Sequence, residues 1–323
     1  MLNDVFEFLN RHSSLIVTTH DPADADGIGA ELIFAFIARG LGKQVRIVNS
    51  SATQEKFRFI DPDGTIEIWK NVEKTVNREA ALVVLDTADE YFIGELRTII
   101  PSVPEVFVID HHEPNKFCTF KGYFDPAASS TCEMVVELAQ AALIKLPLEY
   151  AQAAYAGLTY DTGSFAYLKT TGRTFKTALA LVETGVSPYG VYQKLNESNS
   201  TESLLLQKKV LSTLEIHKQG RVAVLLVLKE DLESTGAFFE DSESFINIPL
   251  KSRDIVVSVL IKENREGHVR CSLRSKGTVN VSKIAQSLGG GGHVSAAGFK
   301  SNMTPAETLA LVLRKIEEEM DKT

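Results

Sequence analysis

Cysteine and long apolar runs are scarce in this chain, and each absence excludes a class of protein. The three cysteines, Cys118, Cys132 and Cys271, are scattered and odd in number, which argues against a disulfide framework. No run of about 18 apolar residues exists, so we expect no membrane-spanning helix and no membrane partner. The N-terminus lacks the basic start and apolar centre of a secretory signal peptide. We therefore expect a cytoplasmic protein with reduced thiols.

An excess of positive charge is missing as well. The formal net charge is −8, which argues against a general binder of long duplex nucleic acid. A small anionic substrate remains compatible with this charge, because metal ions and a few basic residues are enough to hold it. The distribution is uneven, since residues 251–300 contain nine Lys or Arg and three acidic residues. That local excess predicts a module that faces an anion.

The first half of the chain alternates strand-like and helical patterns. Residues 29–40 have a helical pattern, and the runs on either side of them are rich in Val and Ile. Four runs are apolar on both faces, as buried parallel strands require: 15–20, 45–50, 80–87 and 106–112. Strands that alternate with helices predict an α/β fold with a doubly wound parallel sheet.

The pattern changes in the second half. Helices are expected up to about residue 215, with capping signals at Ser130 and Ser187, and residues 199–217 have the pattern of one long helix. Strands are then expected at 221–228, 254–264 and 268–276, followed by a helix at 281–288 and a final helix that begins at Thr304. We expect two domains, 1–195 and 218–323, joined by a helical linker over 196–217. The smaller C-terminal α/β domain should contain a mixed sheet, with a cleft between the domains.

Acidic and imidazole side chains follow three of the predicted strands. In order along the chain, they are His20, Asp24 and Asp26, then Asp86, then Asp110, His111 and His112. In an open α/β sheet, ligands bind outside the carboxyl ends of the strands. Asp161 is a further candidate between helical segments. A lone aspartate at such a position is more often a cap or turn former, but several together point to a shared site.

The residue types in this set favour metal ions. Like charges placed together are unfavourable unless cations neutralise them. Oxygen and imidazole donors suit hard or borderline divalent ions, Mn²⁺ above all, with Mg²⁺ or Co²⁺ as substitutes. Two metals about 3.5–4 Å apart form the usual clamp for in-line phosphoryl displacement. We therefore expect a site for two Mn²⁺ ions, whose bridging hydroxide would attack phosphorus.

These motifs resemble a known family. Asp110-His111-His112 is similar to the signature of the DHH phosphoesterase superfamily, and the other motifs stand in that family's order. The resemblance implies one ion held by His20, Asp24 and Asp86, and a second held by Asp26, Asp86, His111 and Asp161. Asp86 would bridge the ions, His112 would contact the substrate phosphate or tune the nucleophilic water, and Asp110 would orient the histidine pair. The implied catalytic residues are thus Asp86, Asp110, His111 and His112.

The second half carries a glycine-rich motif, Gly289 to Gly298. Consecutive glycines expose backbone N–H groups to a phosphate, although a flexible turn is the simpler interpretation. The preceding strand alternates, so its basic residues share one face, which is either a phosphate site or an ordinary solvated face. The Gly-Gly-Gly-His element resembles the C-terminal domain of one DHH subfamily. That resemblance implies substrate binding by Arg270, Ser272, Arg274, Gly290, Gly291, Gly292 and His293.

The resemblance also implies an activity. The two-lobed form is most similar to bacterial oligoribonucleases of the nanoRNase type, which degrade short RNA to nucleoside 5′-monophosphates and dephosphorylate 3′-phosphoadenosine 5′-phosphate. The expected partners are therefore short RNA oligonucleotides or small nucleotides, and a homodimer stays open. Alternatives are a stand-alone phosphodiesterase for cyclic dinucleotides or the linear dinucleotide pApA, and a RecJ-like short single-strand exonuclease. A non-catalytic nucleotide-binding protein is the alternative from another class.

Overall fold

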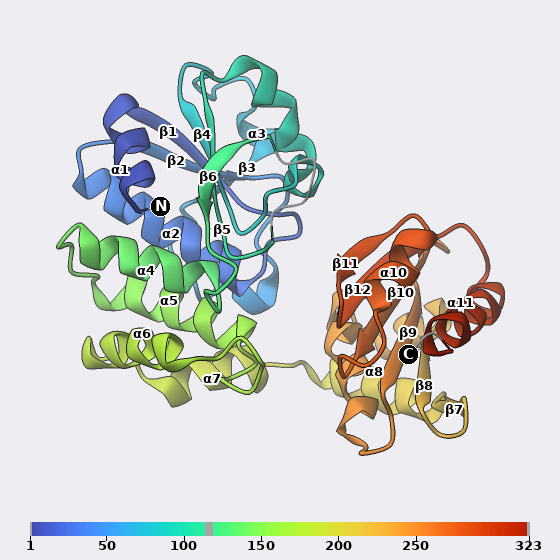
Figure 1. The fold of residues 1–323 in the computed structure, drawn as a ribbon. Helices are drawn as coiled ribbons and strands as arrows, with labels where there is room; N and C mark the ends of the chain where they lie inside the picture. Colours follow the sequence, from blue (N-terminus) through green and yellow to red (C-terminus); the bar gives the residue numbers. More distant parts are fainter. Residues whose placement is uncertain (1, 114–118, 322–323) are drawn as a thin grey trace. The chain divides into compact units, whose positions relative to one another are not determined.

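The computed structural model describes residues 2–113 and 119–321 (Figure 1). The chain divides between Ser198 and Asn199 into two compact units. Both units are α/β, as the sequence predicted. No helix in these described ranges is long and apolar enough to span a membrane.

The first unit is built on a six-stranded parallel sheet. Its strands are β1 (Ser14–Thr18), β2 (Gln44–Asn49), β3 (Ile66–Ile68), β4 (Ala81–Leu85), β5 (Val106–Asp110) and β6 (Lys121–Phe124). They lie in the order β3-β2-β1-β4-β5-β6. The four predicted strands are confirmed as β1, β2, β4 and β5. The short edge strands β3 and β6 were missed because neither carries a continuous apolar run. The direction of winding reverses between β1 and β4, which is where such sheets bind ligands.

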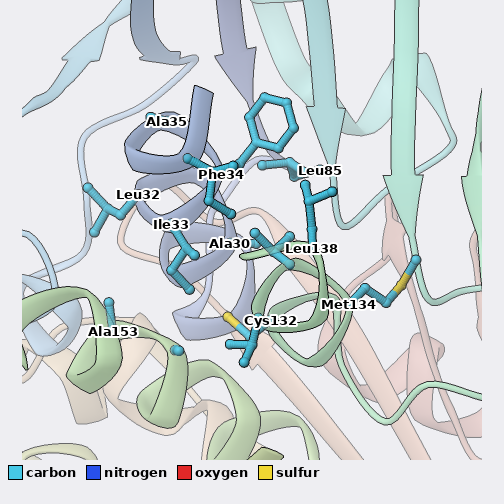
Figure 2. Packing of buried hydrophobic residues seen from close by; sticks show 14 of the residues in the cluster. Ala30, Leu32, Ile33, Phe34, Ala35, Leu85, Cys132, Met134, Leu138 and Ala153 are labelled. Atoms are coloured by element: carbon cyan, nitrogen blue, oxygen red, sulfur yellow. The ribbon is translucent and has the colours of Figure 1, made fainter. Parts of the chain in front are cut away.

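Helices cover both faces of this sheet. The helices are α1 (Leu2–Arg11), α2 (Ala25–Gly40), α3 (Trp69–Val72), α4 (Thr131–Ala141), α5 (Leu148–Asp161), α6 (Gly172–Glu183) and α7 (Pro188–Asn196), with 3₁₀ segments η1 (Glu55–Phe57) and η2 (Glu90–Ser102). The larger core lies between the sheet and α2, α4 and α5, where Ile33, Phe34, Leu85 and Leu138 pack together (Figure 2). The smaller core lies under η2 and α3 on the other face and includes Trp69. This double layer explains why the strand residues are apolar on both sides.

The second unit contains a mixed sheet, as predicted. Its strands are β7 (Glu215–His217), β8 (Val222–Val227), β9 (Val257–Glu263), β10 (Val269–Ser275), β11 (Gly291–His293) and β12 (Ala296–Ser301), in the order β11-β12-β10-β9-β8-β7. Among the described strands of this second sheet, β8 and β9 pair in parallel and the other neighbours pair antiparallel. The helical segments are α8 (Thr201–Ser212), α9 (Lys229–Thr235), η3 (Glu240–Asn247), η4 (Pro249–Lys251), α10 (Val281–Ser287) and α11 (Pro305–Met320). Helices α10 and α11 cover one face, and α8, α9 and η3 cover the other.

The helix predicted over 199–217 is shorter than expected. Helix α8 ends at Ser212, and residues Glu215–His217 form strand β7 instead. The helix packs within the second unit, where Leu206 and Val210 join the core beneath β8. The prediction failed because a hairpin turn at Lys218 and Gln219, both in the left-handed region, pairs β7 with β8. Strand pairing outweighs the local helical pattern there.

Three predicted helix starts are confirmed. The Ser130 hydroxyl accepts a hydrogen bond from the Glu133 amide at 3.0 Å, and Ser187 caps α7 with Pro188 in the first turn. Thr304 forms a complete capping box at the start of α11. The cap at Ser130 matters most, because it fixes where α4 begins beside the strand ends of the first sheet.

A candidate metal centre at the strand ends

The structure brings the predicted acidic and histidine residues of the first unit together. His20 follows β1, Asp24 and Asp26 lie at the start of α2, Asp86 follows β4, Asp110 ends β5 with His111 and His112 after it, and Asp161 ends α5. Strands β1, β4 and β5 are neighbours in the sheet, so their carboxyl ends meet at one edge. Helix α5 delivers Asp161 to the same place because α5 packs along α2.

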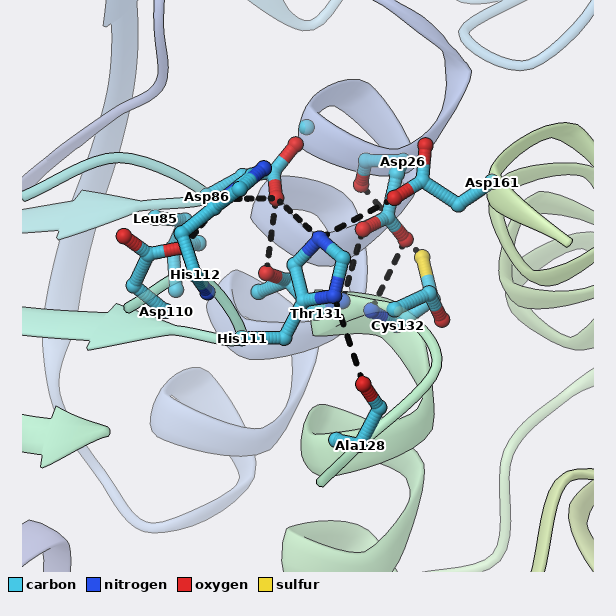
Figure 3. Close-up of polar contacts among 12 residues, drawn as sticks. Asp26, Leu85, Asp86, Asp110, His111, His112, Ala128, Thr131, Cys132 and Asp161 are labelled. Atoms are coloured by element: carbon cyan, nitrogen blue, oxygen red, sulfur yellow. Dashed lines mark hydrogen bonds and ion pairs between the residues drawn. The ribbon is translucent and has the colours of Figure 1, made fainter. Parts of the chain in front are cut away.

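Side-chain donors form three overlapping groups at this edge. The groups are His20, Asp24 and Asp86; Asp26, His111 and Asp161; and Asp86, His111 and His112. Within each group, the ligand atoms all lie within 4.8 Å of one another. Figure 3 shows the side chains of the last two groups pointing toward one another. The groups overlap through Asp86 and His111, so the arrangement is suited to two neighbouring cations rather than one.

Asp86 joins the groups. Its Oδ2 lies 3.5 Å from His20 Nε2, and its Oδ1 lies 3.5 Å from His111 Nε2. The Thr131 hydroxyl donates to Oδ1 at 2.8 Å. The backbone of Asp86 has φ = 64°, a left-handed conformation that aspartate and asparagine adopt more readily than other side chains. The turn after β4 thus points this carboxylate between the two histidines.

Asp26 is held by the start of α4. Its carboxylate is buried and accepts hydrogen bonds from the backbone amides of Thr131, at 2.6 Å, and Cys132, at 2.9 Å (Figure 3). Free amides in the first turn of a helix favour a negative group. Even so, burial and the nearby carboxylates of Asp86 and Asp161 raise the pKa of Asp26 well above its usual value.

The electrostatics of the cluster fit a divalent cation. Burial and repulsion from Asp24 and Asp86 also raise the pKa of Asp161 well above its usual value, and the opposing charges of His112 and His20 do not cancel this effect. Burial lowers the pKa of His111 to about 4, which keeps its ring neutral at pH 7, as a metal ligand must be. Within the described residues, His111 Nε2 is buried and has no hydrogen-bond partner. This nitrogen lies 3.0 Å from Asp161 Oδ2, where a shared cation would satisfy both.

His112 differs from His111 because of Asp110. The Asp110 Oδ1 accepts hydrogen bonds from both the backbone amide of His112, at 3.0 Å, and its ring Nδ1, at 2.7 Å. Burial favours the neutral ring, but the bond to Asp110 and the charge of Asp86 prevail and raise the pKa of His112 to about 9. His112 therefore carries a positive charge at neutral pH, beside the carboxylate cluster, and Asp110 orients it.

Two residues of this site were missed by the sequence prediction. Thr131 contacts both Asp26 and Asp86 through its backbone amide and hydroxyl. The Lys169 ammonium donates to the carbonyl oxygen of His111 at 3.0 Å. Thr131 had a signal, since it directly follows the predicted cap Ser130. Lys169 had none, because its contact depends on the path of the chain after α5.

The basic residues predicted for the second unit lie on one face of β10. Arg270 is exposed, Ser272 and Arg274 are half-buried, and the alternate residues face the core on the other side.

The structure corrects the interpretation of the glycine run as a loop of free amides. The Gly290 amide donates to the carbonyl of Ala285. Gly291 and Gly292 belong to β11, which pairs with β12, so strand pairing uses part of this backbone. The side chain of His293 lies outside the described residues.

The comparisons with known proteins identify the family of this chain. Residues 14–158 match the DHH family, N-terminal domain, and residues 219–322 match the DHHA1 domain. The chain belongs to the DHH phosphoesterase family. The family resemblance predicted from the sequence motifs is thereby confirmed, and the chain is a hydrolase of phosphate esters. In this DHH protein, the ligand groups described above lie within or just beyond the N-terminal match.

Relatives of this DHH chain have several activities in their names. The bifunctional oligoribonuclease and PAP phosphatase NrnA of Thermus thermophilus is 30% identical over 311 residues, covering 95% of this chain and 90% of that protein. The cyclic-di-AMP phosphodiesterase GdpP of Bacillus subtilis is 28% identical over 335 residues, covering 97% of this chain and 49% of that protein. A crystal structure of an exopolyphosphatase-related protein from Bacteroides fragilis has a TM-score of 0.91 at 25% identity and covers 99% of this chain and 96% of its own.

Proposed function

We propose that this DHH phosphoesterase hydrolyses short oligoribonucleotides to nucleoside 5′-monophosphates and removes the 3′-phosphate from 3′-phosphoadenosine 5′-phosphate. The observation that carries the proposal is the set of three overlapping donor groups, two of which share Asp86, together with the charged ring of His112. The name and near-complete coverage of the Thermus relative support this choice of substrates. Within residues 2–113 and 119–321, Cys132 and Cys271 are free and buried, which is compatible with a reducing cytoplasm.

Each donor residue has a proposed role in this chemistry. His20, Asp24 and Asp86 would hold one Mn²⁺, and Asp26, Asp86, His111 and Asp161 would hold the second, with Mg²⁺ or Co²⁺ as substitutes. Such ions supply Lewis acidity and a water of lowered pKa. The crowded carboxylates, whose pKa values are raised, would thereby gain further positive charge.

His112 and Asp110 would contribute to the reaction through hydrogen bonds and charge. The raised pKa of His112 keeps its ring charged, and Nδ1 is bonded to Asp110. An imidazolium donor beside the cluster would bind a phosphate oxygen and stabilise the negative charge that develops on it. Asp110 would hold the ring in that orientation, as a carboxylate commonly does for a functional histidine.

A rate panel with defined substrates tests the proposed function. With Mn²⁺, the purified chain should release nucleoside monophosphates from 5′-labelled short RNA and phosphate from 3′-phosphoadenosine 5′-phosphate. Chelation by EDTA should abolish both reactions, and added Mn²⁺ should restore them. If the Mn²⁺-loaded protein leaves short RNA, pApA and 3′-phosphoadenosine 5′-phosphate all intact, the proposed function is wrong.

A second candidate is cleavage of cyclic di-AMP or pApA. The similarity to GdpP over 97% of this chain favours including it. The same panel separates the two, because a cyclic-dinucleotide phosphodiesterase should cleave cyclic di-AMP or pApA much faster than RNA of other sequences. A chain of the NrnA type should cleave short RNA without requiring adenine at both positions.

The face of β10 is proposed to bind substrate phosphate together with the glycine-rich segment Gly290 to His293. Arg274→Ala should raise KM for pApA roughly 10- to 150-fold, since a hydrogen bond to a charged group contributes about 1.5–3 kcal/mol. Bound metal, measured by mass spectrometry, should stay unchanged. Arg253→Ala removes a strongly exposed arginine of the same unit and serves as the control, with KM unchanged. An unaltered KM in the Arg274 variant, or loss of metal from it, would contradict this division of labour.

A further inference from the structure

The segment that follows Asp161 has an unusual and well-fixed backbone. Gly163, Ser164 and Phe165 are consecutive residues in the left-handed region, with φ of 55°, 56° and 68°. Non-glycine residues persist in that conformation only where surrounding contacts require it. Here the Thr162 carbonyl accepts hydrogen bonds from the amides of Ala166 and Tyr167, both at 2.9 Å. The result is a tight turn whose hydrogen bonds fix the backbone of Ala166 and Tyr167.

Tyr167 lies flat on this turn. A side chain added at Gly163 would meet the Tyr167 ring, with its Cβ only 2.5 Å from ring atoms Cε1 and Cζ. The ring therefore packs over the bare Cα of Gly163, and yet the residue is 57% exposed. Phe165 also holds the turn in place, because its ring stacks on that of Phe175 with centroids 5.3 Å apart. Tyr167 thus presents one aromatic surface to solvent at little cost in side-chain entropy.

Both ends of the turn are attached to the metal centre. Asp161, two residues before Gly163, belongs to the same donor group as Asp26 and His111. Lys169, two residues after Tyr167, donates to the His111 carbonyl at 3.0 Å, and its Nζ lies 3.5 Å from His111 Nδ1. The exposed ring is therefore held between two residues that touch the phosphate-processing cluster.

We propose that Tyr167 is a stacking platform for a nucleobase of the substrate. An aromatic face held rigidly beside a phosphate site suits a base, because every base has a π-face and stacking tolerates different sequences. The neighbouring Lys169 adds positive charge that favours the attached phosphate. This inference rests on the proposed function and adds to it a recognition element for the base in the first unit, independent of the β10 face.

Substitutions at Tyr167 test the platform directly. Tyr167→Ala should raise KM for pApA roughly 5- to 150-fold, the range that base stacking on an aromatic side chain contributes, with kcat changed far less. Tyr167→Phe keeps the ring and should retain the wild-type KM. Tyr189→Ala, which removes an equally exposed tyrosine on α7, should also leave KM unchanged. A dinucleotide with an abasic residue in place of each adenosine should be cleaved equally well by wild type and Tyr167→Ala.

Binding without turnover provides the second readout. Titration calorimetry of the Mn²⁺-loaded protein with a non-hydrolysable analogue of pApA should show weaker binding in Tyr167→Ala than in Tyr167→Phe. If KM and binding are unchanged in Tyr167→Ala, or if the abasic substrate is affected to the same degree as pApA, the platform is refuted. These failures differ from failure of the proposed function, in which wild type itself would cleave no substrate of the panel.

Discussion

Replacing Asp86 with asparagine should lower kcat/KM for short RNA by at least about 10³-fold, because residues that act as a unit in a catalytic site cost this much or more when one is removed. Asp86 belongs to two of the three donor groups, and its two oxygens face His20 and His111. Asparagine has one neutral oxygen and one amide nitrogen in their place. The loss should therefore affect both cation sites at once, and bound Mn²⁺ measured by mass spectrometry should fall together with activity.

Asparagine is a more informative substitution than alanine at this position. The backbone of Asp86 is left-handed, a conformation that asparagine tolerates and alanine does not. Asparagine can also keep the hydrogen bond from the Thr131 hydroxyl. Asp86→Asn should therefore unfold at or near the wild-type temperature, so that lost turnover reports on the site and not on folding.

An exposed aspartate of the same unit provides the control. Asp63→Asn removes one negative charge from the surface and should leave both metal content and kcat/KM unchanged. Retention of wild-type turnover by Asp86→Asn with full metal content would show that the shared carboxylate is not required, and the two-cation assignment would then be wrong.

Gly157→Val should lower the stability of the first unit by about 3 kcal/mol, which corresponds to a fall in Tm of roughly 6–12 °C. Gly157 lies on α5 where this helix passes the starts of α2 and α4. A Cβ at Gly157 would lie 2.9 Å from the backbone Cα of Asp26, and it would lie even closer to the Cys132 sulfur. Backbone cannot move away as a flexible side chain can, so α5 or α2 must shift.

The shift should also weaken the metal centre. Asp26 supplies one donor and Asp161, at the end of α5, supplies another, so separating the two helices separates their carboxylates. Scanning calorimetry of the full chain should show the transition of the first unit moved to lower temperature and bound Mn²⁺ reduced. Gly172→Ala is the matched control, because nothing lies within 4 Å of a Cβ at that position and helix α6 favours alanine. An unchanged Tm for Gly157→Val would contradict the close packing described.

Much of the candidate site was predictable because its residues follow strands of one parallel sheet. The runs that became β1, β4 and β5 are apolar throughout, and each is followed by a carboxylate or imidazole. Parallel strands place all their carboxyl ends at the same edge, so separate motifs are expected to converge. Asp161 was recognised through the family motif, whereas its position at the end of a helix beside Asp26 came from the structure.

The conformations of two other segments were decided by pairing with a strand elsewhere in the chain, and not by the local sequence pattern. Residues Glu215–His217 continue a helical pattern, but pairing with β8 makes them a strand. The glycine run is flexible by composition, but β12 pairs with part of it. In both cases, a partner elsewhere in the chain supplied the backbone hydrogen bonds that decided the conformation.

The sequence by itself determined the α/β class, the strands that deliver ligands, the family and the identity of the donor residues, since these follow from periodicity and from short motifs. Only the tertiary structure decided that Thr131 contacts two carboxylates of the site, that Lys169 contacts His111, and that Tyr167 lies against Gly163. The amide of Thr131 bonds to Asp26 across 105 residues of sequence. Contacts at that separation arise from the packing of α2, α4 and α5, and no local pattern of side chains encodes them.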